Sequence, residues 1–163
     1  MKAYQTLFAV LLLVLTSMVG IAAAKEPISI VSKAEIEETV VNEQGEKETR
    51  RVPAAKVMPG TIVFFTNTCT NVSDSPIDDV VINNPIPEHT VYIDSSATEA
   101  GVAVTFSTDN GNTFDAPGNL FIVEQDGTSR PATGRDYTHV RWQLKSSLKP
   151  GESKDVEFRA RLK

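Results

Sequence analysis

Apolar and polar positions alternate over several tracts of this chain, and such a period of two predicts strands with one buried face. The last tract alternates without interruption, and the tract around Trp142 repeats the pattern. Because Trp142 lies in mid-tract on the apolar side, we interpret it as a core anchor in preference to a ligand-stacking platform. The apolar positions of these two tracts are Val140, Trp142, Leu144, Val156, Phe158, Ala160 and Leu162.

The densest apolar stretch, residues 59–87, opens on a Pro-Gly turn. The run Thr61–Thr66 then predicts a strand that is apolar on both faces. A polar turn over residues 71–76 separates it from Ile77–Asn83, which we predict to be its partner strand. Two prolines after residue 84 end this second strand, because proline cannot donate a hydrogen bond to a β-ladder.

The stretch Ala34–Val41 is open to two interpretations. Its glutamates suit a charged helix, whereas its β-branched residues suit a strand. Gly45 marks a turn shortly after it, so we predict a charged hairpin over Ile36–Val57, preceded by a short strand at Ile28–Val31. Charges along such strands also discourage edge-to-edge association.

The second half of the chain adds further short strands separated by turns. They are predicted at Thr90–Ile93, at residues 102–106 and at Leu120–Val123, in addition to the two alternating tracts. Many short strands at regular spacing are typical of one architecture. The sequence therefore predicts an all-β fold, an antiparallel β-sandwich of about seven to nine strands.

The N-terminus predicts export. Lys2, the apolar run Leu7–Leu15 and the small residues Ala22–Ala24 form a secretory signal peptide that would be cut before Lys25. An uncleaved anchor is the alternative, but the run is short for a span of about 20 residues. We expect an exported protein, periplasmic or extracellular in the cell envelope, with no membrane span after cleavage. The predicted parts are a signal peptide (1–24), N-terminal strands joined to the sandwich (25–57) and the sandwich itself (58–163).

Charge and cysteine content narrow the classes of partner. The formal net charge is -5 and there is no basic cluster, which argues against nucleic acid as a partner. Cys69 is the only cysteine, so the fold contains no internal disulfide. It could bridge to another chain, although a buried thiol that fills space in a strand is the commoner case and the one we favour.

One polar loop carries most of the candidate chemistry. Ser107–Phe114 resembles the Asp-box hairpin of sialidase-type propellers, in which Asp109 would hydrogen-bond the turn backbone. We interpret it as a turn in preference to a glycan site. Asp109, Asn112 and Asp115 are oxygen ligands that could suit calcium, but their spacing is not that of an EF-hand.

No catalytic or cofactor signature emerges elsewhere. His89 and His139 have no cysteine or carboxylate at metal-ligand spacing, so we expect neither a zinc site nor another cofactor. The serines lack a Gly-x-Ser-x-Gly context. A small enzyme that uses Asp94 with the loop carboxylates is a residual hypothesis, and we assign no catalytic residue.

The central stretch carries a series of short elements: Asn67–Thr68, Val80–Ile82, Pro85–Pro87 and Val91–Ile93. With these elements the chain resembles, over about residues 28–163, the bacterial surface-repeat domain catalogued as domain of unknown function 11. Asn84 stands where that family usually has aspartate. The resemblance implies an immunoglobulin-like sandwich in exported or cell-surface proteins, with no enzymatic activity.

These observations lead to a functional expectation. We expect a non-catalytic structural or interaction module of the cell envelope, with protein partners bound through a strand edge or a loop. The alternative is a glycan- or calcium-binding module that uses the loops around Asp109–Asp115.

Overall fold

The computed structural model describes residues 26–97 and 100–163. The expected signal peptide, residues 1–24, and its cleavage point before Lys25 lie outside the described residues. The described chain holds ten strands and one short 3₁₀ helix. These are β1 (Ile28–Val41), β2 (Lys47–Pro53), β3 (Ile62–Asn71), β4 (Val81–Pro85), β5 (Thr90–Tyr92), β6 (Val102–Ser107), η1 (Pro117–Asn119), β7 (Phe121–Val123), β8 (Ser129–Pro131), β9 (His139–Leu144) and β10 (Ser153–Leu162).

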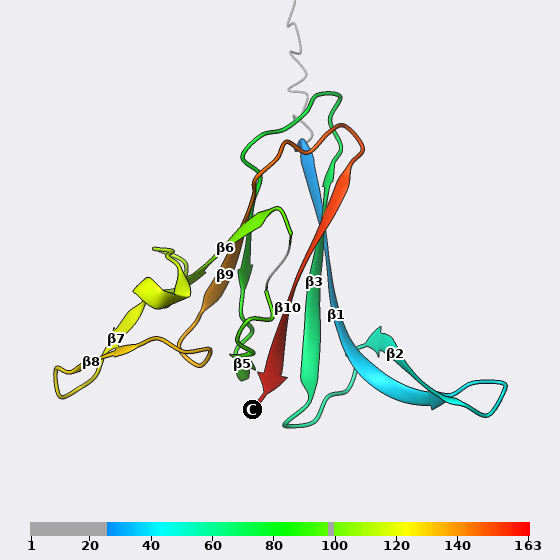
Figure 1. Ribbon diagram of the computed structural model, residues 1–163, viewed down its shortest axis with the longest axis horizontal. Coiled ribbons are helices and arrows are strands. Elements are labelled where there is room, and N and C mark those ends of the chain that lie inside the picture. Colours follow the sequence, from blue (N-terminus) through cyan, green and yellow to red (C-terminus); the bar gives the residue numbers. More distant parts are fainter. Residues whose placement is uncertain (1–25, 98–99) are drawn as a thin grey trace, which may run out of the picture.

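Two sheets face each other and a third, smaller one stands to the side (Figure 1). The larger sheet has the order β2-β1-β3-β10-β5, the second β4-β9-β6, and the small one pairs β7 with β8. Every pair of strands is antiparallel. The all-β, sandwich-like fold predicted from the sequence is confirmed. The strand count is above the predicted range because residues 118–135, expected to hold one strand, hold both β7 and β8.

The core lies between the two larger sheets. Phe158 of β10 and Trp142 of β9 are both 0% exposed, and their rings are 6.1 Å apart across the sandwich. Phe158 also stacks on Phe65 of β3 at 4.9 Å. Trp142 donates from Nε1 to the carbonyl oxygen of Ala97 at 3.2 Å, so its one polar group is satisfied. The interpretation of Trp142 as a core anchor is confirmed.

The predicted pairing within the central stretch is wrong. β3 pairs with β1 and β10, whereas β4 belongs to the opposite sheet and pairs with β9. The polar turn after β3 therefore crosses from one sheet to the other. Ile77, the predicted start of the second strand, makes only an isolated bridge to Leu148. The crossing lets the apolar side chain of Ile82 cover the core from the second sheet, where it is 1% exposed.

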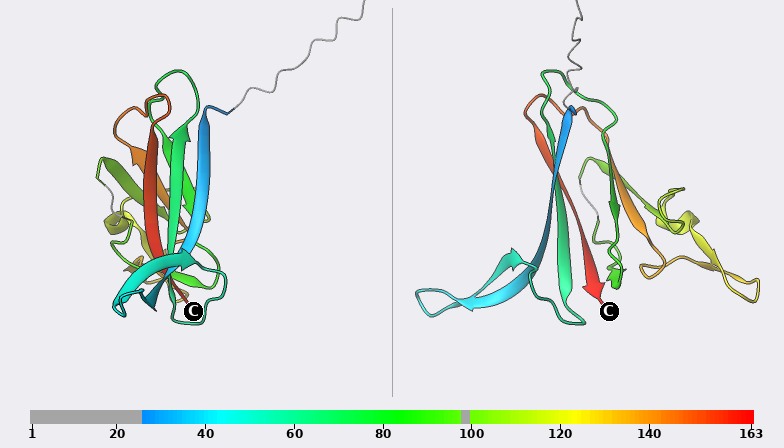
Figure 2. Two further views of the ribbon diagram at one scale, coloured as in Figure 1. Left: turned by 90° about the vertical axis from the view of Figure 1, so that its right-hand side faces the viewer. Right: turned by 180° about the vertical axis from the view of Figure 1, so that it is seen from behind.

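β1 pairs with two different strands along its length. Its first half pairs with β3, from Ile28 opposite Asn71 to Glu35 opposite Phe64. Its second half pairs with β2, and the resulting hairpin projects from the sandwich on the side away from the β7–β8 hairpin (Figures 1 and 2). The strand interpretation of Ala34–Val41 is confirmed, and the separate strand expected at Ile28–Val31 is its continuation.

β3 is apolar on both faces, as predicted, and a side chain of β2 covers the face that points away from the core. Phe64 points away from the core side and is 7% exposed, because the guanidinium of Arg51 lies 4.0 Å from its ring centroid. Arg51 in turn forms a bidentate ion pair with Glu157 on β10. No helix in the described residues is long and apolar enough to cross a membrane.

Candidate functional site

One candidate site is a cleft beside the edge strands β5 and β6. Its volume is about 500 Å³. Tyr92 comes from β5, Val104 and Phe106 come from β6, and Pro117 and Gly118 come from η1. The loop residues that line the cleft are Asp94, Ser95, Ala97, Ala132, Thr133 and Tyr137.

Three aromatic rings form the floor of this cleft. Phe106 and Tyr137 stack with ring centroids 4.5 Å apart, and Tyr92 packs on Phe106 at 4.9 Å. The Tyr92 hydroxyl accepts a hydrogen bond from the Ala97 N–H at 3.1 Å. Burial raises the pKa of both tyrosines, so the phenols stay neutral at ordinary pH. A floor of neutral rings with a single carboxylate, Asp94, on the wall is typical of small-molecule binding sites.

Gly134 allows one wall of the cleft to approach β5. A Cβ atom at this position would lie 2.2 Å from the Tyr92 carbonyl oxygen, which no side chain could relieve. The close approach places the Tyr92 N–H 3.2 Å from the Gly134 carbonyl oxygen. Gly134 therefore fixes the segment that presents Thr133 and Tyr137 to the cleft.

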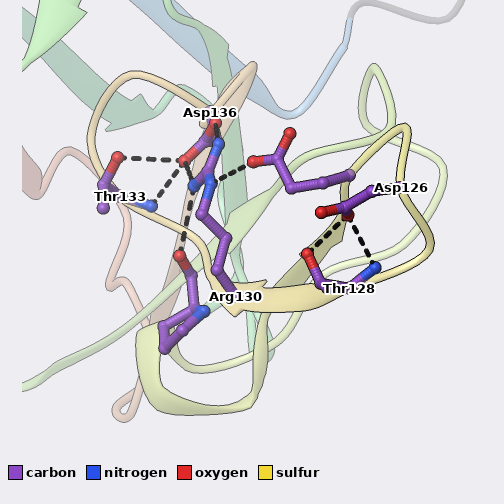
Figure 3. Close-up of polar contacts among 7 residues, drawn as sticks. Asp126, Thr128, Arg130, Thr133 and Asp136 are labelled. Carbon is purple, nitrogen blue, oxygen red and sulfur yellow. Dashed lines mark hydrogen bonds and ion pairs between the residues drawn. The ribbon is translucent and has the colours of Figure 1, made fainter.

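An arginine clamp holds the β7–β8 hairpin to that same segment (Figure 3). Arg130 of β8 forms two parallel hydrogen bonds with the Asp136 carboxylate, at 2.7 and 2.8 Å, and one with Glu124 at 2.5 Å. Thr133 donates to Asp136 from both its N–H and its hydroxyl. The Asp136 side chain is 13% exposed, and the facing guanidinium lowers its pKa. Such bidentate pairs are the strongest kind of surface ion pair.

Loss of the clamp should loosen the hairpin without unfolding the sandwich. We expect Arg130→Gln to raise amide hydrogen exchange in β7 and β8 by about tenfold, since hydrogen bonds to charged groups contribute roughly 1.5–3 kcal/mol. Arg135→Gln is the matched control, because Arg135 is exposed and forms no ion pair among the described residues. Equal exchange in the two variants, measured by mass spectrometry, would contradict the role of the clamp.

The loop after β6 is organised by its first aspartate. The Asp109 carboxylate accepts hydrogen bonds from the Ser107 hydroxyl at 2.6 Å, the Thr113 N–H at 2.9 Å and the Thr113 hydroxyl at 2.7 Å. Asn110 and Gly111 turn the chain with φ of 61° and 83°. The structure thus shows the turn that the Asp-box resemblance implied.

The candidate calcium ligands in this loop are engaged with the loop itself. The Asn112 amide donates to the Asp109 carbonyl oxygen at 2.6 Å, and the Asp115 carboxylate accepts from Ala116 and Asn119. Over residues 26–97 and 100–163 no group of three or more metal-ligating side chains lies close enough to hold an ion. Of the three carboxylates considered for an enzyme, only Asp94 lines the cleft.

The hydrogen bonds to Asp109 predict a stability that depends on pH. They lower its pKa from 3.8 to about 2. A pKa below the unfolded value means that this stabilisation is complete above about pH 4 and is lost as the pH falls through the folded-state pKa. We expect the urea midpoint to fall between pH 4 and pH 2, and to fall less in Asp109→Asn. An identical fall in the variant would show that Asp109 contributes nothing to the pH dependence of stability.

The cysteine and the two histidines considered from the sequence lie in a buried strand and in a surface hollow, respectively. Cys69 on β3 is 0% exposed, and burial raises the pKa of its thiol, which makes the thiolate scarce. His89 and His139 both line a surface hollow of about 300 Å³ with Glu88. The His139 ring lies 3.4 Å from the position that a Cβ on Gly111 would take, so it packs on the Asp109 loop.

Sequence reasoning missed the clamp and the cleft. In the sequence, Glu124 lies six residues before Arg130 and Asp136 lies six residues after it, a spacing that marks no motif.

Comparison with protein-family models found no matching family, and comparisons with curated proteins and with solved structures found no match either.

Proposed function

We propose that this protein is a non-catalytic, exported β-sandwich protein that works as an interaction module of the cell envelope. The observation that carries the proposal is the exposure of apolar side chains at two separate places on the sandwich. Ile30 and Val31 of β1 are 50% and 55% exposed, and Phe121 and Val123 of β7 are 55% and 74% exposed. Exposed apolar groups at strand edges gain free energy when a partner covers them.

Two features of the sequence support export and an envelope role. The N-terminal pattern is that of a cleaved signal peptide, and the central stretch resembles a surface-repeat domain. The loop carboxylates considered for an enzyme also support a non-catalytic role. Asp109 and Asp115 accept hydrogen bonds from their own loop, so both are engaged in holding the turn.

A pull-down from envelope extract tests this proposal. The purified protein should retain specific envelope proteins, and the same proteins should be retained with and without reductant, because the buried Cys69 thiol is not available for a bridge. Turnover of an envelope substrate by the purified protein would contradict the proposal, and partners lost on reduction would return Cys69 to consideration.

The cleft favours a second candidate, a glycan-binding module. Its volume of about 500 Å³ lies in the range of small-molecule sites, and Pro117 and Gly118, which follow the Asp109–Asp115 loop, supply a wall. Titration with mono- and disaccharides should then shift NMR signals of Tyr137 and Val104. Titration with millimolar calcium, read as a thermal shift, separates the calcium version of this candidate from the glycan version.

A further inference from the structure

The first half of β1 presents an unpaired backbone edge. The Val72 N–H bonds to the Pro27 carbonyl, and the Ala54 N–H bonds to the Ala34 carbonyl. Since hydrogen-bonding direction alternates along a strand, the odd-numbered residues of β1 face β3 and the even-numbered ones face the opposite side. Pairing with β2 begins only at Glu35. Among the residues that the structure describes, no strand pairs with the N–H and C=O groups of Ile28, Ile30 and Ser32, which therefore form an open edge of the larger sheet.

A groove with an apolar floor lies along this open edge. It has a volume of about 440 Å³ and is lined by Ile28 and Ile30 of β1 and by Ile77, Val80 and Val81 from across the sandwich. Ile30 shares the inward face with Ile28, which packs against the core, yet it is half exposed. The second sheet ends at β4, so no strand within residues 26–97 and 100–163 covers this part of β1.

One end of the groove is closed by a polar bridge between the sheets. The Ser32 hydroxyl donates to the Asn67 amide oxygen at 2.6 Å, and the Asn67 amide donates to Asn84 of β4 at 3.1 Å. The other end is acidic. Glu26, Asp78 and Asp79 line it, and within the described chain the groove lining includes no lysine or arginine.

Three of the other edges of the two larger sheets are guarded in ways that this one is not. β2 carries four charged residues and ends at Pro53, β4 ends at Pro85, and β5 is only three residues long. On the fourth, β6, Phe106 forms an isolated bridge with Asp115. Charges, prolines and short lengths are the devices by which natural sheets prevent strand addition. Between Ile28 and Ser32 β1 has none of them.

We propose that the open edge of β1 receives an extended segment of a partner protein, in which apolar residues alternate and basic residues stand at the end beside Glu26. The segment adds antiparallel to β1, as do both of the neighbours that β1 already has. A second copy of this chain fits less well, since its net charge is -5 and it would bring the same acidic groups to the contact. This inference rests on the proposed function and names its surface and partner chemistry.

Peptide titration followed by fluorescence anisotropy tests the inference. The probe is a labelled nine-residue peptide, Lys-Lys-Val-Thr-Val-Thr-Val-Lys-Lys, with blocked ends. When the valines face the groove, antiparallel pairing directs their N–H groups to β1 and those of the threonines to solvent. We expect N-methylation of the valines to abolish binding and N-methylation of the threonines to preserve it. Glutamate in place of lysine should weaken binding about tenfold at low salt.

Protein variants locate the site. Ile30→Gln should weaken peptide binding about tenfold, whereas Val31→Gln, an equally exposed position on the outer face of the same strand, should change it less than about twofold. Asp79→Asn should weaken binding and reduce its salt dependence, and asparagine tolerates the φ of 52° at this position. Circular dichroism verifies that each variant is folded.

The outcomes separate this inference from the proposed function. Equal binding of the two N-methylated peptides, or equal effects of Ile30→Gln and Val31→Gln, would overturn the inference. Concentration-dependent self-association that Ile30→Gln removes would assign the edge to a second copy, which also overturns it. Envelope proteins captured equally by wild type and Ile30→Gln would leave the proposed function standing while the inference fails.

Discussion

Phe158→Ala is expected to destabilise the protein by about 3–5 kcal/mol, the usual loss when a buried aromatic ring is removed from a well-packed core. Phe158 is fully buried at the centre of the sandwich. Its ring contacts Phe65 within its own sheet and Trp142 on the opposite sheet. Alanine would therefore leave a cavity between the two sheets and remove the contacts that Phe158 makes across it.

Urea unfolding measured by Trp142 fluorescence checks this result. Phe121→Ala is the matched control, because the same side chain is removed from a position that is 55% exposed. We expect the control to change the free energy of unfolding by no more than about 0.5 kcal/mol. A similar loss in both variants would mean that Phe158 does not have the central packing role assigned to it.

Asn71→Asp is expected to cost about 3 kcal/mol or more, although it replaces only an amide group by a carboxylate. Asn71 is 0% exposed, and its Nδ2 donates to the carbonyl oxygens of Ser75 and Leu148, both at 2.8 Å. Its Oδ1 accepts from the N–H and the hydroxyl of Ser73. Aspartate would turn an acceptor toward both carbonyl oxygens, of which that of Leu148 is buried, and would leave them unpaired beside a charge.

Asn42→Asp is the matched control, because it makes the same substitution in an exposed turn. Asn42 lies in the β1–β2 turn, where its Oδ1 accepts from the N–H groups of Gln44 and Glu46. A carboxylate can accept both bonds, so the control should leave the urea midpoint nearly unchanged. Equal destabilisation of the two variants would show that charge alone, and not the lost donors of Asn71, is responsible.

The strands of the core were predictable because the pattern that identifies them is local. Val156, Phe158 and Ala160 alternate with charged residues, and all three are 1% exposed or less. The tract of Trp142 behaves in the same way. Burial on one face imposes a period of two, and that period can be read without knowing the neighbouring strands.

The pairing of the strands was not predictable in the same way. The sequence placed Ile77–Asn83 beside β3 because a short polar turn joins them. The turn that crosses between the sheets here is held by Asn71, whose side chain donates to the carbonyl oxygen of Leu148, 77 residues away. A contact between residues so far apart in the sequence leaves no periodic pattern of apolar and polar positions.

The candidate sites escaped prediction for a related reason. The clamp of Arg130 and the aromatic floor of the cleft join residues from separate loops and strands, and each residue taken alone is ordinary. The groove beside β1 is visible only once the second sheet is known to end at β4. The loop of Asp109 was predictable because the partners of its carboxylate lie within four residues in the sequence.

The register of β1 and β10 on β3 gives the fold a mechanical property. β1 begins beside Asn71, at one end of β3, whereas β10 ends beside Ile62, at the other end (Figure 1). If the start of β1 and the end of β10 are pulled apart, the two strands are drawn lengthwise along β3 in opposite directions. The force then loads their ladders of hydrogen bonds in shear. Because many bonds must then break together, the chain should resist forced extension more than a sheet that is peeled open strand by strand.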